Sequence, residues 1–170
     1  MSNFAFIDAQ NLHLGIRSQG WHLDYRKFRL YLKNKYKISE AFMFIGYVPA
    51  NQALYTTLEK AGFALVFKPS VIRHVNGHVS VKGNVDAELV LHAAAIEYGA
   101  YDKAVIVTND GDFYCLAEFL MQRCKLLKVI APNNRYSSLF RRLSGYVATL
   151  EPLREQLGNK ETGIGVRSKP

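Results

Sequence analysis

The residues of this sequence that are best suited to chemistry are aspartates, of which the 170-residue chain has six. Asp8 directly follows the apolar run FAFI, and Asp110 and Asp112 come just after a second apolar run, AVIV. Asp86 begins the helical pattern that precedes this second run. Carboxylates held close together repel one another and raise each other's pKa, and a divalent cation between them removes the conflict. Because clustered carboxylate oxygens suit Mg²⁺ or Mn²⁺, these aspartates predict a metal site if the fold brings them together.

The elements that must position the aspartates are short apolar runs alternating with amphipathic stretches. The apolar runs predict strands at 4–7, 41–45, 63–67, 104–107, 126–131 and 146–150. The amphipathic stretches predict helices at 10–18, 23–36, 51–61, 85–98, 112–122 and 137–143. Asn76-Gly77, flanked by alternating valines, predicts a β-hairpin within 70–83. This alternation predicts an α/β sandwich with a mostly parallel central sheet.

In open α/β sheets, ligands bind outside the carboxyl ends of the strands. We therefore expect Asp8, Asp110 and Asp112 at one edge of the sheet, with Asp86 facing them from the start of a helix. Each aspartate also has a structural alternative: Asp8 as a strand-end turn residue, Asp112 as a helix cap, and Asp86 as a carboxylate favoured by a helix dipole. Taken singly, these structural roles are the commoner ones. Taken together, the strand-end positions favour a binding site.

Three motifs in this order resemble the NYN domain, in particular the LabA-like branch of the PIN-like nucleases: FIDAQNL at 6–12, KGNVD at 82–86 and VTNDGDF at 107–113. The likeness covers about residues 3–150. It implies a PIN-like three-layer α/β sandwich whose acidic cluster binds Mg²⁺ or Mn²⁺ and cleaves RNA. The catalytic residues that it implies are Asp8, Asn11, Asp86, Asp110 and Asp112.

Within this set the four aspartates are expected to bind the metal, Asp8 and Asp110 directly, and Asp86 and Asp112 directly or through water. Asn11 is expected to orient a water or a phosphate oxygen through its amide. Asn109 departs mildly from the small residue that the family often has at its position, whereas no acidic motif residue is replaced.

Three further residues are candidates for contact with a nucleic acid. Lys82 either binds a phosphate or is a hairpin-edge lysine that discourages aggregation. Trp21 lies in a polar stretch after Gly20, where it is a candidate for stacking on a base. Arg135, with two more arginines at 141 and 142, forms a basic group near the last motif. The five histidines show no metal-ligand spacing and are expected to be solvated or satisfied in the core.

The net charge agrees with a polyanionic partner. The chain has 22 lysines and arginines against 14 acidic residues, a formal net charge of +8, and a pI of about 9.5. Such a charge is typical of proteins that bind nucleic acid, although it also serves to keep a small domain soluble.

The rest of the sequence predicts one domain, residues 1–157, followed by a disordered polar tail, 158–170. The N-terminus lacks the pattern of a signal peptide, and no apolar run reaches membrane-spanning length. Because the two cysteines lie nine residues apart with no CxxC spacing, we expect neither a disulfide framework nor a structural zinc site. We expect a cytoplasmic protein with no membrane partner. The segment Leu150-Leu153-Leu157 either supports a homodimer or packs back on the core.

These observations favour a metal-dependent ribonuclease. A non-catalytic RNA-binding or regulatory module of the same fold is the alternative. A Mg²⁺-dependent phosphohydrolase is disfavoured, because phosphatases of the haloacid-dehalogenase type carry Asp-x-Asp after the first strand, and here Asp8 is followed by Ala9 and Gln10.

Overall fold

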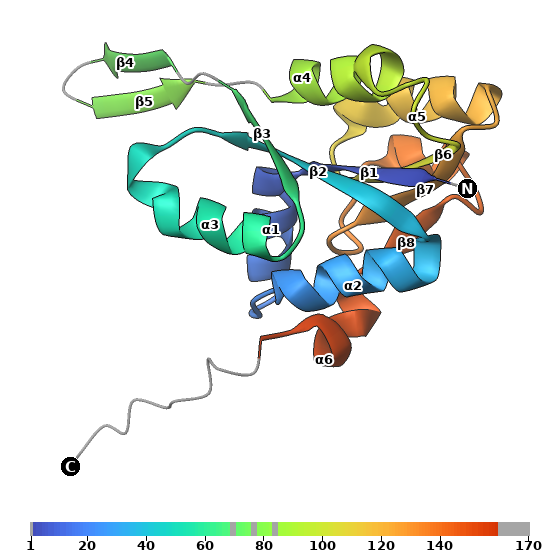
Figure 1. The fold of residues 1–170 in the computed structure, drawn as a ribbon, viewed down its shortest axis with the longest axis horizontal. Coiled ribbons are helices and arrows are strands. Elements are labelled where there is room, and N and C mark those ends of the chain that lie inside the picture. Colours follow the sequence, from blue (N-terminus) through green and yellow to red (C-terminus); the bar gives the residue numbers. More distant parts are fainter. Residues whose placement is uncertain (1, 69–70, 76–77, 83–84, 160–170) are drawn as a thin grey trace.

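A computed structural model of the chain describes residues 2–68, 71–75, 78–82 and 85–159, and for 71–75 and 78–82 it describes the backbone (Figure 1). Its centre is a six-stranded, entirely parallel sheet in the order β3-β2-β1-β6-β7-β8. The strands are β1 (Asn3–Asp8), β2 (Ile38–Gly46), β3 (Ala64–Lys68), β6 (Lys103–Val107), β7 (Leu126–Ala131) and β8 (Val147–Thr149). A separate antiparallel hairpin consists of β4 (Val71–Val75) and β5 (His78–Lys82).

The strand order places a topological switch at the centre of the sheet. From β1 the chain builds outward through β2 to β3, then returns to β6 beside β1 and builds outward in the other direction through β7 to β8. β1 and β6 pair in register from Asn3 opposite Lys103 to Ile7 opposite Val107. In such sheets the crevice for ligands opens at the carboxyl ends of the strands on either side of the switch. Here these ends lead to Asp8 and to Asp110.

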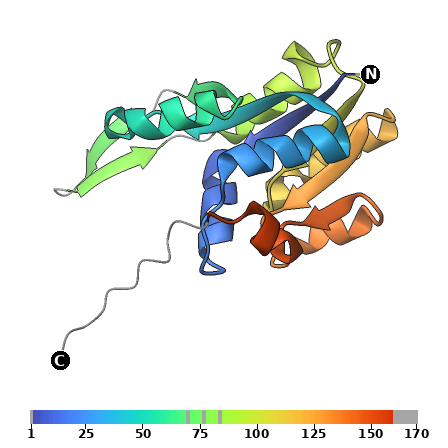
Figure 2. The same ribbon diagram turned by 60° about the horizontal axis from the view of Figure 1, so that its bottom comes forward.

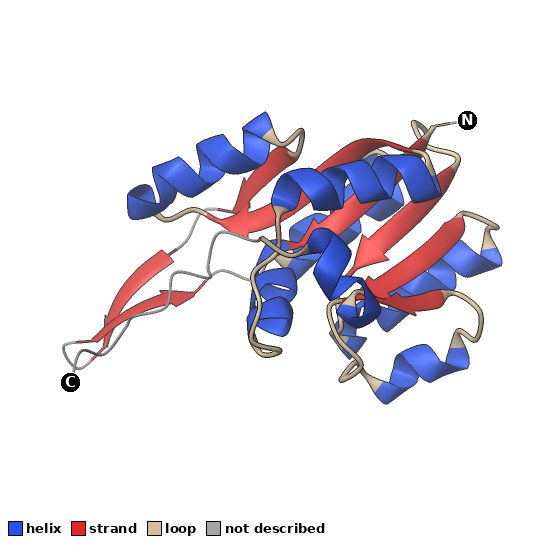
Figure 3. Ribbon diagram, turned by 90° about the horizontal axis from the view of Figure 1, so that it is seen from below, coloured by secondary structure: helices blue, strands red, loops and turns tan. Residues whose placement is uncertain are grey.

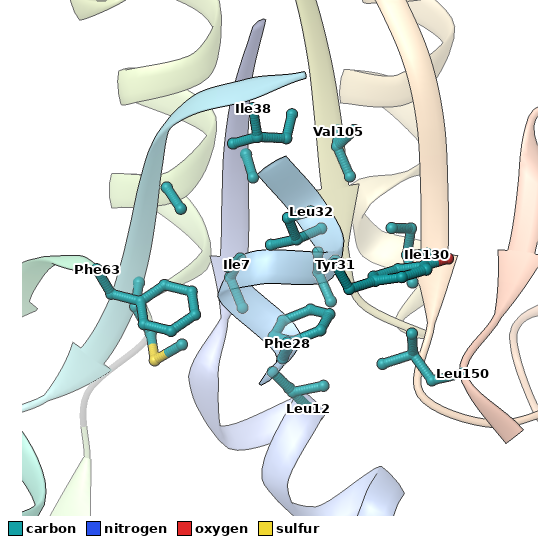
Figure 4. Close-up of a cluster of buried hydrophobic side chains, with 14 of the residues drawn as sticks. Ile7, Leu12, Phe28, Tyr31, Leu32, Ile38, Phe63, Val105, Ile130 and Leu150 are labelled. Atoms are coloured by element: carbon teal, nitrogen blue, oxygen red, sulfur yellow. The ribbon is translucent and has the colours of Figure 1, made fainter. Parts of the chain in front are cut away.

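Helices cover both faces of the sheet, which gives three layers (Figures 1 and 3). The helices are α1 (Ala9–Arg17), α2 (Tyr25–Tyr36), α3 (Gln52–Lys60), α4 (Asp86–Leu91), α5 (Tyr114–Gln122) and α6 (Arg154–Leu157). Because successive strand residues point to opposite faces, Ile7 joins the core under α1 and α2, whereas Phe6 joins the core under α4 and α5. Figure 4 shows the first of these clusters, in which Phe28 and Leu32 of α2 meet Ile7 and Val105.

The predicted elements are confirmed, with local differences. The helix expected at 85–98 begins as α4 and continues as a π-helical turn, His92–Ile96. The helix expected at 112–122 starts with a 3₁₀ turn, Gly111–Phe113, and that at 137–143 is a 3₁₀ helix, Ser138–Arg142. The two hairpin strands form as expected, and the Asn76-Gly77 turn lies outside the described residues.

The C-terminal part of the described chain packs back on the core. Leu150 and Leu157 are buried, Leu153 packs against them, and α6 lies under α2 (Figure 2). Of the two roles considered for this segment, the structure thus shows packing back on the core. The expected tail at 158–170 lies almost wholly outside the described residues. Among the helices that are described, none has the length and the apolar character needed to cross a bilayer.

Candidate active site

The candidate site begins at the last residue of β1. The Asp8 side chain caps α1, because its carboxylate accepts a hydrogen bond from the backbone N–H of Asn11 at 3.1 Å. Asp8 is only 6% exposed. Asp8 thus has a structural role, as a helix cap and not as the turn residue considered from the sequence. The same position holds a carboxylate at the switch point of the sheet, next to the end of β6.

Three more carboxylates meet beside it. Asp86, Asp110 and Asp112 each offer one oxygen, and these three oxygens lie within 4.8 Å of one another. Asp86 comes from the start of α4, and the other two come from the loop that follows β6. The Asp110 side chain is fixed within its loop, because its carboxylate accepts a hydrogen bond from the backbone N–H of Asp112 at 3.0 Å. Asp112, which was expected to be either a helix cap or a ligand, is exposed, and it is Asp110 that caps the turn.

The set of donors fits a hard divalent cation. Mg²⁺ prefers oxygen ligands at about 2.0–2.1 Å, so two ligands of one ion lie at most about 4.2 Å apart. The carboxylate oxygens of Asp86, Asp110 and Asp112, all within 4.8 Å of one another, lie close to this spacing. A cation of this kind would also offset the repulsion between the carboxylates.

Asp8 takes part in the same electrostatic cluster, although it lies outside the group of three within 4.8 Å. Its pKa is raised to about 6, first by burial and then by the charges of Asp86 and Asp110, while the backbone N–H of Asn11 opposes the shift. Asp8 therefore lies close enough to Asp86 and Asp110 for their charges to act on its carboxylate. Carboxylates with strongly raised pKa values are found more often at functional sites than elsewhere.

Asn11 is held by Asn109. The Asn11 side chain donates to the Asn109 side-chain oxygen at 2.7 Å and accepts the Asn109 backbone N–H at 2.8 Å. Both polar atoms of the Asn11 amide are thus engaged between α1 and the loop after β6. This geometry supports a positioning role for Asn11, whereas the sequence suggested contact with a water or a phosphate. Asn109 was seen in the sequence only as a departure from the family pattern.

A second contact, which the sequence did not suggest, fixes the Asp110–Asp112 loop from the side of β7. If residue 111 had a side chain, its Cβ would lie 2.4 Å from the Oγ of Ser137 and 2.9 Å from the Cβ of Ser137. Ser137 also donates its backbone N–H to the carbonyl of Asn109 at 3.0 Å. The loop between the two aspartates therefore lies directly against Ser137, and only glycine allows this approach.

The three expected contacts with nucleic acid have different outcomes. The prediction for Trp21 is wrong: it is 5% exposed and packs in the core under α1 and α2. Arg135 is exposed in the loop after β7, two residues before Ser137, and so lies at the same edge of the sheet as the aspartates. The side chain of Lys82 lies outside the described residues.

A parallel α/β sandwich with carboxylates at its switch point is consistent with the PIN-like class of folds. The sequence profile of the NYN domain matches residues 4–166, and the chain therefore belongs to the NYN domain family, within the PIN-like nuclease superfamily. The profile does not decide its branch, so the LabA-like assignment stays a prediction.

One solved structure has the same fold: a protein of unknown function from Vibrio parahaemolyticus, at 22% sequence identity and a TM-score of 0.76. The similarity covers 93% of this chain and 96% of the other. Among curated proteins, none matches the chain significantly.

Proposed function

We propose that this NYN domain is a metal-dependent ribonuclease that hydrolyses RNA phosphodiester bonds with Mg²⁺ or Mn²⁺. The observation that supports this most is the convergence of Asp86, Asp110 and Asp112 within 4.8 Å, with Asp8 coupled to them. The chain has a net charge of +8 although its candidate site is acidic. The positive charge of the whole chain suits a polyanionic substrate, and a cation at the acidic site would bind the reactive phosphate of that substrate. Two free, exposed cysteines agree with a reducing compartment, and we propose the cytoplasm.

The aspartates have the central role in this proposal. A bound Mg²⁺ or Mn²⁺ would lower the pKa of a water and neutralise charge on the transferring phosphate. Asp86, Asp110 and Asp112 would hold the cation, with Asp8 as a direct or water-mediated ligand. Asn11 and Asn109 would keep the starts of α1 and of the Asp110 loop at a fixed separation. Arg135, exposed at this edge, would bind a phosphate of the substrate.

The test is cleavage of a labelled single-stranded RNA with Mg²⁺ or Mn²⁺, and with EDTA. We expect Asp8→Asn and Asp110→Asn to reduce cleavage at least about 100-fold while the protein stays folded, since such losses are common when a group that stabilises transition-state charge is removed. Asp24→Asn is the matched control, because Asp24 also caps a helix, α2, and asparagine caps about as well. Full activity of the Asp110→Asn variant would contradict the proposal.

Metal binding is tested independently of activity. Mg²⁺ at 100 times its Kd should stabilise the wild-type protein by about 2.7 kcal/mol and the Asp110→Asn variant by much less. Anomalous density for Mn²⁺ in a soaked crystal should lie between Asp86, Asp110 and Asp112. RNA binding without cleavage would favour the non-catalytic module instead, and hydrolysis of a small phosphate monoester would favour the phosphohydrolase.

A further inference from the structure

A pocket of about 370 Å³ opens beside the aspartates. Its wall is formed by the first turn of α1, the end of β2 and the start of α3, with Val85 on the remaining side. Met43 and Leu58, both buried, contribute to its apolar lining, and the side chains of Gln10, His13 and Asn51 border it as exposed residues. The volume is at the small end of the range typical of ligand sites.

Two residues that line the pocket are chain neighbours of the candidate site. Ala9, which lines it, directly follows Asp8, and Val85, which also lines it, directly precedes Asp86. Consecutive Cα atoms lie 3.8 Å apart, so the backbone that carries two of the four carboxylates is also a wall of the pocket. The pocket is thus within reach of a nucleotide chain that has one phosphate at the aspartates.

The outer wall of the pocket is held in place by a buried tyrosine. The hydroxyl of Tyr55, a residue only 1% exposed, accepts the backbone N–H of Val48 at 2.7 Å. The same hydroxyl lies 3.2 Å from the carbonyl oxygens of Gly46 and of Val48, to either of which it can donate. Gly46 and Val48 both line the pocket. This backbone is thus fixed by side-chain hydrogen bonds, as expected of a preformed binding site.

The chemistry of the lining selects the kind of ligand. Among the described residues that line the pocket there is no lysine or arginine, so the pocket itself is unsuited to a phosphate. Apolar side chains with a few amide and imidazole groups at the border match a flat ring with polar edges. His13 lies near two other basic side chains, and burial together with Arg17 and His22 lowers its pKa. A neutral imidazole offers one donor and one acceptor to such a ring.

We propose that this pocket holds one nucleobase of a single-stranded RNA, the base of a nucleotide adjoining the phosphate at the aspartates. The inference rests on the proposed ribonuclease function and adds the form of its substrate. A base stacked and paired in a duplex cannot enter a pocket, whereas an unpaired base can be turned out and bound on its faces and edges. Continuous duplex RNA is then a poor substrate.

The experiment uses single-stranded RNA oligonucleotides in which one abasic ribose is moved along the chain. We expect one position next to the cut to lose about 10-fold in kcat/KM, in line with what single base contacts contribute. Leu54→Trp, which enlarges an exposed side chain lining the pocket, should lower cleavage of the intact RNA and abolish the effect of that abasic position. Leu30→Trp, an exposed leucine on α2 that does not line the pocket, is the matched control.

A second pair of variants keeps the test decisive if Leu54→Trp does not fold. Asn51→Ala removes a polar group at the border of the pocket. Gln52→Ala removes one from the next residue, which is also exposed and does not line the pocket. The proposal predicts that only Asn51→Ala reduces the penalty of the abasic position. Wild-type cleavage that is insensitive to abasic sites, or a penalty that both pocket variants leave unchanged, overturns the pocket but not the ribonuclease.

Failure of the proposed function gives a different result. If the wild-type protein cleaves no RNA with either metal, the binding of the same oligonucleotides is measured by fluorescence anisotropy. A single abasic position that weakens binding in the wild-type protein but not in Leu54→Trp still supports a nucleobase in the pocket. Equal binding of all the oligonucleotides overturns it.

Discussion

The amides of Asn11 and Asn109 bind each other across the junction between α1 and the loop that follows β6. One hydrogen bond joins the two side chains at 2.7 Å, and the other runs from the backbone N–H of Asn109 to the Asn11 side-chain oxygen at 2.8 Å. Asn11 lies three residues after Asp8, and Asn109 lies directly before Asp110. The pair thus links the two strand ends that deliver carboxylates to the site.

From this link we predict that Asn11→Ala and Asn109→Ala act as one unit. Each should lower metal-dependent cleavage about 10–100-fold, as is typical when a group that orients metal ligands is lost. The double variant should be little worse than Asn11→Ala, because Asn11→Ala removes both hydrogen bonds and Asn109→Ala removes only the one between the two side chains. The measurement compares kcat/KM and Mg²⁺-induced stabilisation for the two single variants and the double variant, and shows whether the two effects are additive. If Asn11 instead contacts the substrate, Asn11→Ala should raise KM strongly and Asn109→Ala should have little effect.

A second prediction concerns Gly111, which separates Asp110 from Asp112. Gly111→Ala should weaken Mg²⁺ binding about 10-fold, because the new Cβ would come within 2.4 Å of the Ser137 Oγ and must displace the loop. Adding Ser137→Gly to the Gly111→Ala variant removes the Oγ and the Cβ of Ser137, the two atoms that the new Cβ would meet. This double variant should regain much of the Mg²⁺ binding. Gly99→Ala is the control, since a Cβ there meets nothing within 4 Å. The prediction fails if Gly111→Ala binds Mg²⁺ as the wild type does.

The sequence predicted the sheet and the aspartates because both are locally encoded. Apolar runs mark strands of a buried parallel sheet, and residues directly after such runs must lie at its carboxyl edge. Asp8 and Asp110 were therefore placed correctly relative to each other. The contacts of Asn109 and Ser137 depend on how three segments from distant parts of the chain meet. No local sequence pattern predicts such contacts.

Trp21 was misplaced for the same reason. Its neighbours Gly20 and His22 are typical of an exposed turn, but the segment is covered by residues more than 130 positions away. The backbone N–H of Asp24 donates to the carbonyl of Leu157 at 2.8 Å, and Leu23 forms an isolated bridge with Gly158. These contacts bring α6 over the segment and bury the indole.

A third prediction follows for Trp21. Trp21→Ala should lower the free energy of unfolding by about 3–5 kcal/mol, as expected for a large aromatic side chain removed from a core. Trp21→Phe should cost less, because most of the apolar surface is kept and the buried indole N–H has no hydrogen-bond partner among the described residues. Urea denaturation measures both. The RNA affinity of the folded variants should equal that of the wild type, whereas a stacking role would lower it without loss of stability.

The fourth prediction concerns the stability of the metal-free protein and its dependence on pH. The pKa of Asp8 rises on folding from 3.8 to about 6. Between these values the native state holds a proton that the unfolded state has lost, so ionising Asp8 destabilises the fold as the pH rises through this window. The cost at pH 7 is up to about 3 kcal/mol, since one pKa unit corresponds to 1.36 kcal/mol.

Asp8→Asn should remove this cost and keep the cap of α1, because asparagine also accepts a backbone N–H at a helix start. The metal-free variant should therefore be more stable than the wild type at pH 7, by up to about 3 kcal/mol, and the difference should vanish near pH 4. Urea denaturation from pH 4 to pH 7 measures it, with Asp24→Asn as the control for exchanging a capping carboxylate. Saturating Mg²⁺ should reverse the order at pH 7, because the cation stabilises the ionised carboxylates of the wild type and gains less from the amide. An Asp8→Asn variant that is less stable than the wild type at pH 7 without metal would show that burial and the neighbouring carboxylates do not raise the pKa of Asp8.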